Sequence, residues 1–460
     1  MTEALNPRYK PPSRDSLSNH LIPAWYEVDK ANLISMLSGI SNMAITADGW
    51  TSVCQDHYLT ITLHYVRQGK IEGKVLCTKA VYQAQTGINV AEEIEEILQE
   101  YRVREKVVAA TVDNASNMAV ALRTLAIVRI GCFAHTLNLA AQKIIKCQSI
   151  SNWAARVRSV IVWMKSVSMA KVVLKEKQKL LNLPQHMMIL DVKTRWNSSY
   201  LMIKRFYEQF PAIEAAVMDP RLRKQSDKEK LVENLQTEDM RRAEEFLHLM
   251  GVLYTSTLCI SSERSPTWSN FANFKENEEV QIFLEEATVM DPRFKMKIES
   301  DAIWERLRTA AVVMAITEEQ EQEEAQTLEE EEDQEEVEEE DYSPPAKHRK
   351  TALEELFEEE DHSTVPKQAR RTIREQVDLE VQIYSSLPAI PMSGDPVLWW
   401  WEKSGSLPLL SALAEKYLCV QASSTPSERV FSTAGDTISL ERSRILPEKA
   451  DMLVFLHKNC

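Results

Sequence analysis

Glycine is scarce in this chain, with 10 Gly among its 460 residues, against a usual share of about 7%. Few tight turns and long helices fit this scarcity. Long apolar runs are missing too. Because no stretch reaches about 18 apolar residues, we expect no membrane span. The first residues hold no apolar stretch, so we also expect no signal peptide.

Paired cysteines are the next absence. The chain has seven Cys residues, an odd number, and none of them forms a Cys-x-x-Cys pair. A disulfide framework or a zinc ribbon is therefore not indicated. We expect the protein to work in a reducing compartment.

Basic charge does not offset the acidic charge, and the net charge is -15. The excess lies in one run, residues 318–341, which holds 16 acidic residues and no Lys or Arg. Outside this run the chain is almost neutral. A run of like charges repels itself and stays solvated. Any DNA binding must therefore come from local basic patches.

The order of apolar patterns predicts an α/β core. Residues 58–66 alternate apolar and polar side chains, as half-buried strands do, and residues 90–101 have helical spacing. From residue 150 the pattern becomes helical throughout. We expect strands at 43–47, 58–66, 74–82, 107–112 and 129–133, and helices at 29–37, 90–101 and 135–146. This order, with acids on the first and fourth strands, is the pattern of RNase H-like folds.

Two aspartates follow apolar strands. Asp48 closes the first predicted strand and Asp113 closes the fourth. Carboxylates at the ends of adjacent strands can converge, and Mg²⁺ prefers such oxygen ligands. A third carboxylate would complete a site for phosphoryl transfer with two metal ions. The alternative is that both are ordinary turn aspartates.

Five segments, in chain order, resemble the motifs of hAT-superfamily DNA transposases and of the zinc finger BED domain-containing proteins derived from them. Each motif alone is weakly specific, but the ordered set is specific. The segments are Thr46–Ser52, Thr111–Met118, Cys132–Leu139, Arg195–Ser198 and Ala422–Ser432.

The resemblance implies an α/β fold with an RNase H-like core, interrupted by a large all-α insertion and followed by a C-terminal hAT dimerisation segment. The expected domains are an N-terminal arm and helix at 1–40, the first part of the core at 41–148, the helical insertion at 149–316, an acidic and disordered linker at 317–374, and the end of the core with the dimerisation region at 375–460.

The resemblance also implies a catalytic site. Asp48, Asp113 and Glu428 would hold Mg²⁺ or Mn²⁺ and activate water or a 3′-hydroxyl for attack on a phosphodiester. Arg195 and Trp196 would bind DNA, with Trp196 stacked on an extruded base. The alternative for Trp196 is a place in the protein core.

Cys132 and His135 form the family's Cys-x-x-His element. Zinc needs about four ligands, and no second pair has suitable spacing. We therefore expect a structural pair and no zinc site. Many relatives begin with a zinc-binding BED finger, and no such set of Cys and His precedes Asp48. We expect the finger to be lacking, which puts recognition of specific DNA ends in doubt.

The last residues predict self-association. An apolar helical face at about 395–457 lies beside the family's dimerisation block, so we expect a homodimer or a higher homo-oligomer. Basic clusters at 347–350 and 367–371 could serve as a split nuclear import signal, so we expect a nuclear location. The resemblance implies DNA as the partner. The residues expected at the dimer contact are Val430, Phe431, Leu453 and Phe455.

Two functions fit these observations. In the first, the three acids serve a DDE-type transposase. In the second, the chain is a domesticated and catalytically silent regulator of transcription. The sequence leaves this choice open.

Overall fold

The computed structural model describes residues 12–52, 54–192, 195–222, 237–262, 265–266, 278–297, 300–336, 371–438 and 445–459. The chain divides into two compact units. The first holds residues 1–67, 71–268 and 419–460, and the second holds 68–70 and 269–418. The domain boundaries expected from sequence remain predictions. In the described residues, no helix is long and apolar enough to cross a membrane.

A five-stranded mixed sheet forms the centre of the first unit. The spatial order of its strands is β3-β2-β1-β4-β5. Strand β1 pairs antiparallel with β2 and parallel with β4, and β4 pairs parallel with β5. The strands are β1 (Met43–Thr51), β2 (His57–Arg67), β3 (Lys70–Ala80), β4 (Val107–Val112) and β5 (Val128–Gly131). The predicted α/β fold and order of elements are confirmed.

Strand β1 is longer than the sequence indicated. It continues through Asp48 to Thr51, because β2 supplies partners along this whole length, from Met43 opposite Tyr65 to Thr51 opposite His57. Asp48 therefore lies within the strand and not at its end, which corrects the prediction. Side chains alternate between the two faces of a strand. Thr46, Asp48 and Trp50 therefore share one face of the sheet.

The opposite face of the sheet carries the main apolar core. Met43, Ile45 and Ala47 point into it, and the helices α3 (Ile22–Ser38), α4 (Gly87–Glu100) and α5 (Ser116–Thr124) cover it. Helix α4 begins at an N-cap, Thr86, whose hydroxyl accepts a hydrogen bond from the N–H of Asn89. Its buried positions recur at helical spacing, so one face of α4 packs on the sheet.

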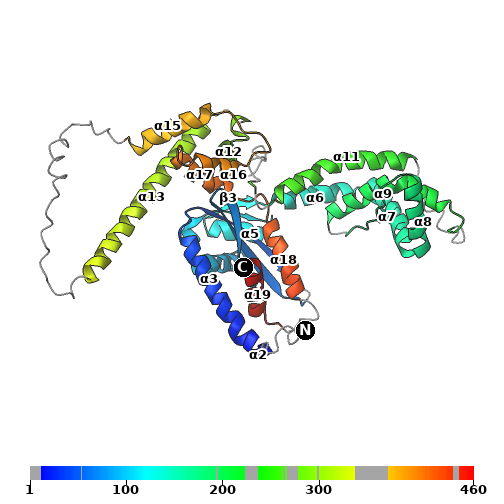
Figure 1. Cartoon of the computed structure of the whole chain (residues 1–460), viewed down its shortest axis with the longest axis horizontal. Coiled ribbons are helices and arrows are strands. Elements are labelled where there is room, and N and C mark those ends of the chain that lie inside the picture. Colours follow the sequence, from blue (N-terminus) through cyan, green and yellow to red (C-terminus); the bar gives the residue numbers. More distant parts are fainter. Residues whose placement is uncertain are drawn as a thin grey trace, which may run out of the picture. The chain divides into compact units, whose positions relative to one another are not determined.

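The face that carries Asp48 is covered by the C-terminal helices α18 (Thr425–Thr437) and α19 (Pro447–Asn459). Figure 1 shows them in orange and red beside the strands. Apolar contacts join α18 to the end of β1. Trp50 stacks on Tyr58 with ring centroids 5.0 Å apart, and its ring centroid lies 5.5 Å from that of Phe431 in α18. Helices from the C-terminal part of the chain thus cover a sheet whose strands lie in its N-terminal part.

Helix α19 also occupies the edge of the sheet. The Asn459 side-chain amide donates to the carbonyl of Val75 at 2.7 Å, and its oxygen accepts from the N–H of Val75 at 3.0 Å. Asp451 accepts from the N–H of Thr78. Open strand edges can pair with other chains. These two side chains take up backbone groups of the edge strand β3.

A bundle of helices follows the sheet in the first unit, and it has its own apolar core. No strand occurs here in the residues described between 148 and 262. The helices are α6 (Phe133–Lys146), α7 (Gln148–Ser166), α8 (Ser168–Leu180), α9 (Trp196–Val217) and α11 (Thr237–Ile260).

The second unit is mainly helical in its described residues from 278 to 418. The unit holds three consecutive tryptophans, Trp399–Trp401, which are partly core: the Trp400 indole N–H donates to the carbonyl of Met290 at 2.7 Å, while Trp401 is 48% exposed. Helix α13 runs to Glu336, so the first part of the acidic run is helical. The rest of that run and nearly all of the two basic clusters lie outside the described residues. The helices are α12 (Glu278–Met290), α13 (Asp301–Glu336), α15 (Ile373–Ser386), α16 (Pro396–Lys403) and α17 (Pro408–Leu418).

One five-residue sequence ends a helix in each unit. Val-Met-Asp-Pro-Arg occupies residues 217–221 at the end of α9 and residues 289–293 at the end of α12. In both copies one Asp oxygen accepts from the backbone N–H and the Nε of the Arg two residues later, at 2.9–3.1 Å. The same sequence therefore makes the same helix stop twice.

Candidate active site

Asp48 lies half-buried in β1, opposite Thr60 of β2. Its Oδ1 accepts a hydrogen bond from the N–H of Gly49 at 2.8 Å. Because β1 is the central strand of the sheet, the carboxylate has a rigid support. Its position depends on strand pairing and not on a loop.

The other two predicted acids come from separate elements. Asp113 directly follows β4, and its Oδ1 accepts from the N–H of Ala115 at 3.0 Å, which fixes the turn into α5. Glu428 lies exposed in the first turn of α18. A carboxylate at a helix N-terminus is favoured by the helix dipole.

The charges of the three acids act on one another. The pKa of Asp48 is raised to about 7, first by burial and then by the charges of Glu428 and Asp113. Desolvation and like charges both disfavour a carboxylate anion. Glu428 and Asp113 therefore belong to the electrostatic surroundings of Asp48, although they lie far apart in sequence. A cation here would relieve this repulsion.

The donor chemistry suits Mg²⁺ or Mn²⁺, which take carboxylate oxygens. The side chains are not gathered at ligand spacing, however: in the described residues no three His, Cys, Asp or Glu form a group that could hold a metal ion. Their ligand role remains a prediction.

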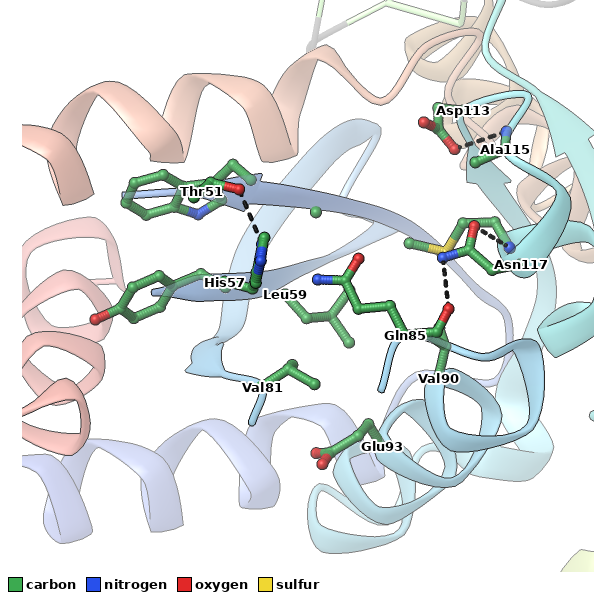
Figure 2. A pocket seen from close by; sticks show the side chains of 14 residues that line it. Thr51, His57, Leu59, Val81, Gln85, Val90, Glu93, Asp113, Ala115 and Asn117 are labelled. Atoms are coloured by element: carbon green, nitrogen blue, oxygen red, sulfur yellow. Dashed lines mark hydrogen bonds between the residues drawn. The ribbon is translucent and has the colours of Figure 1, made fainter. Parts of the chain in front are cut away.

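A cavity of about 230 Å³ lies beside Asp113, between the ends of β1 and β2 and the helices α4 and α5. Figure 2 shows Gln85, Glu93 and Asn117 around it, and the hydrogen bond between Thr51 and His57 on its wall. None of its fourteen lining residues is Lys or Arg, while Glu93 and Asp113 are acidic. This lining does not favour a phosphate group.

The segment that carries Glu428 is held by polar contacts from several elements. Its backbone and side chains meet β4, α6 and the end of α11. The contacts are Thr111 Oγ1 to the Gln421 carbonyl at 2.6 Å, Phe133 N to the Ala422 carbonyl at 3.0 Å, Ser423 Oγ to the Ile260 carbonyl at 3.1 Å, and Arg429 Nη2 to the Ser261 carbonyl at 2.7 Å.

Cys132 is buried and caps α6, where its Sγ accepts from the N–H of His135 at 3.4 Å. The same Sγ accepts from the N–H of Ser424 at 3.4 Å. The contact with His135 runs through its backbone and not through its imidazole. Burial raises the pKa of the Cys132 thiol. Cys132 thus ties the start of α6 to the segment before Glu428.

Trp196 and Arg195 lie at the start of α9. Trp196 is 4% exposed and belongs to the core of the helical bundle, while Arg195 is exposed. The structure therefore fits the alternative of a core tryptophan. Stacking of Trp196 on a base stays a prediction, and it would require the ring to leave this core.

Three of the four predicted dimer residues pack against partners in their own chain. Val430 is buried against Val75 and Val454, and Phe455 is buried with its ring 5.0 Å from that of Tyr26. Phe431 contacts Trp50, and Leu453 is half-buried. Their role at a dimer contact stays a prediction.

The sequence analysis did not single out Thr46 and Ser427, which neighbour the candidate acids. Their hydroxyl oxygens lie 2.5 Å apart, and both residues are fully buried. The repeated hydroxyls in residues 423–427 were the available signal. Sequence alone did not show that one of them reaches β1.

Three family models match this chain. Residues 46–129 match the ZBED1 RNase-like domain, residues 130–240 match the ZBED1 RNase-like helical domain, and residues 380–460 match the hAT family C-terminal dimerisation region. Together they cover more than half of the chain. The chain belongs to the hAT transposase family. Its sheet is therefore the RNase-like domain of that family.

Curated relatives of this chain agree with this assignment. Zinc finger BED domain-containing protein 4 of Homo sapiens is 25% identical over 100% of this chain and 41% of its own length. The putative AC transposase of Zea mays is 22% identical over 98% and 61%. The putative transcriptional regulator tpeD of Talaromyces stipitatus is 20% identical over 97% and 57%. The chain thus spans about half the length of these relatives.

Proposed function

We propose that this chain binds DNA in the nucleus as a homo-oligomer, and that Asp48, Asp113 and Glu428 support metal-dependent cleavage and transfer of DNA strands. The observation that carries the proposal is the raised pKa of Asp48, to which both other acids contribute. Perturbed carboxyl groups of this kind gather at functional sites. Membership of a family that includes a putative transposase supports it further.

The three acids would act together. Mg²⁺ or Mn²⁺, when bound, stabilises the attacking and leaving oxygens of phosphoryl transfer. Asp48 would provide a fixed ligand from the central strand, while Glu428 would approach from α18 and Asp113 from the turn after β4. Near pH 7 the carboxyl group of Asp48 would release its proton as the cation binds.

A second function is favoured by a different observation. Within the described residues the acids are not gathered at ligand spacing, and one relative has the name of a putative transcriptional regulator. The chain would then be a domesticated DNA-binding protein that regulates transcription without catalysis.

The deciding experiment is cleavage of pre-nicked or hairpin-prone DNA by the purified chain with Mg²⁺ or Mn²⁺. We expect cleavage by the wild type and none by Asp48→Asn, Asp113→Asn or Glu428→Gln. Glu92→Gln, which removes an exposed carboxylate from α4, serves as the control. A wild type that binds DNA without cutting it would reject the nuclease and favour the regulator.

A further inference from the structure

The sheet face beneath α18 is unusual in being buried and polar. Residues opposite one another in the register, Thr46 with Thr62 and Ala44 with His64, lie side by side on this face. A buried hydroxyl without a partner costs about 1–3 kcal/mol. The buried polar residues of this face are Thr46, Thr60, Thr62, His64, Thr78 and Thr111.

Three of these buried side chains, together with Ser427, form a continuous hydrogen-bonded chain into α18. His64 Nε2 lies 2.9 Å from Thr62 Oγ1, which lies 2.6 Å from Thr46 Oγ1. Thr46 Oγ1 lies 2.5 Å from Ser427 Oγ, and Ser427 Oγ donates to the carbonyl of Thr46 at 3.1 Å. Ser427 directly precedes Glu428.

Counting protons gives the chain a direction. A hydroxyl donates one hydrogen, and we assign the hydrogen of Ser427 to the Thr46 carbonyl, which can only accept. Thr46 must then donate to Ser427, and Thr62 must donate to Thr46. His64 must therefore donate from Nε2 to Thr62, because the hydrogen of Thr62 is already used.

The surroundings of His64 agree with this direction. Burial lowers the pKa of His64 to about 3, so the ring is neutral and carries one hydrogen. Its Nδ1 is buried and has no hydrogen-bond partner among the residues that the structure describes. Gly73 leaves this nitrogen room, because a Cβ at that position would lie 3.3 Å from Nδ1. A ring with its hydrogen on Nε2 avoids leaving a buried N–H unpaired.

We propose that His64, Thr62, Thr46 and Ser427 are positioning residues, whose one-way hydrogen-bonded chain fixes α18 on β1 and holds Glu428 beside Asp48. The expected effect of this chain on metal binding rests on the proposed function. Apolar contact is non-directional, whereas a hydrogen bond constrains both distance and angle. The polar end of the interface can therefore set the position of α18 in a way that its apolar end cannot.

Matched substitutions separate the hydroxyl from the volume that it fills. Thr46→Val and Ser427→Ala remove hydroxyls of the chain, while Thr46→Ser keeps the hydroxyl and loses only a methyl group. Thr78→Val is the control, because Thr78 is buried on the same face and its hydroxyl pairs with Thr60, outside the chain.

Two measurements on the full chain test separately how firmly α18 is held and how well the proposed site binds a metal ion. Amide hydrogen exchange of α18 without metal should become at least about tenfold faster in Thr46→Val and Ser427→Ala. The dissociation constant for Mn²⁺, measured by calorimetry, should rise about tenfold in the same two variants. Thr46→Ser and Thr78→Val should match the wild type in both measurements.

The outcomes are distinguishable. Unchanged exchange of α18 in Thr46→Val and Ser427→Ala would overturn the inference, and so would faster exchange with unchanged Mn²⁺ affinity. A wild type that binds no Mn²⁺ would reject the proposed metal site, and the exchange of α18 would then decide the inference alone. Nitrogen-15 NMR should find the His64 hydrogen on Nε2, and a hydrogen on Nδ1 would overturn the direction of the chain.

Discussion

Asp48 links the chemistry of the site to the stability of the fold. An unfolded Asp has a pKa near 3.9, while burial and the two neighbouring acids raise the pKa of Asp48 to about 7. Between these values the folded chain keeps a proton that the unfolded chain releases. The free energy of unfolding of the metal-free chain therefore falls as pH rises through this window.

Replacing Asp48 should remove this pH-dependent loss. We expect Asp48→Asn to be more stable than the wild type at pH 8 by about 2–4 kcal/mol, and this difference should shrink towards pH 4. Urea denaturation without metal at several pH values measures it, with Glu92→Gln as control. Mn²⁺ should stabilise the wild type at pH 8 and not Asp48→Asn. A wild type that gains stability from pH 4 to 8 relative to the variant would contradict the prediction.

Sequence predicted the residues whose signal is local. Asp48 and Asp113 each follow an apolar run, and the resemblance added Glu428. Thr46 and Ser427 carry no such signal. The two residues are 381 positions apart in the chain, and only the fold brings them together. Burial of Trp196 depends likewise on how several helices pack.

Among the elements, the two helix stops differ in burial. Asp291 is fully buried and Arg293 is 9% exposed, whereas Arg221 of the first copy is 44% exposed. Removing one partner of a buried ion pair takes away stabilisation from the buried charge that remains, which costs up to about 3–5 kcal/mol. Exposed pairs contribute far less because solvent screens them.

Arg293→Met should therefore destabilise its helical unit by about 3–5 kcal/mol. Arg221→Met is the matched control, and it should have a clearly smaller effect. Urea denaturation followed by tryptophan fluorescence measures both. Equal losses in the two variants would show that the shared motif, and not its burial, sets the stability.

The strands were also predictable as elements, because apolar runs and alternation mark them. The extension of β1 to Thr51 was not predicted, since Asp48 and Gly49 disfavour a strand and only pairing with β2 overrides them. Local preference thus located the strands, while tertiary pairing decided how far the first of them continues.

At the scale of the whole molecule, self-association and folding should respond to different residues. Leu398 and Trp401 lie one turn apart on α16, within the family's dimerisation region, and are 44% and 48% exposed. Phe455 in the same region is buried in its own unit. We expect exposed apolar residues of this region to take part in association.

Leu398→Asp and Trp401→Asp should weaken self-association in analytical ultracentrifugation while leaving the melting temperature close to that of the wild type. Phe455→Ala should instead lower the free energy of unfolding by about 3–5 kcal/mol. Unchanged association in both charged variants would remove this face of α16 from the oligomer contact.

The polar face of the sheet has a consequence during protein synthesis. Ser427 is made 381 residues after Thr46, a delay of roughly 20 to 80 seconds on a ribosome. Until α18 has been synthesised, it cannot cover Thr46, Thr62 and His64. Their polar groups can form hydrogen bonds to water during this time, whereas an apolar surface of the same size would attract other nascent chains. The polar face that positions α18 therefore also resists aggregation before α18 has been synthesised.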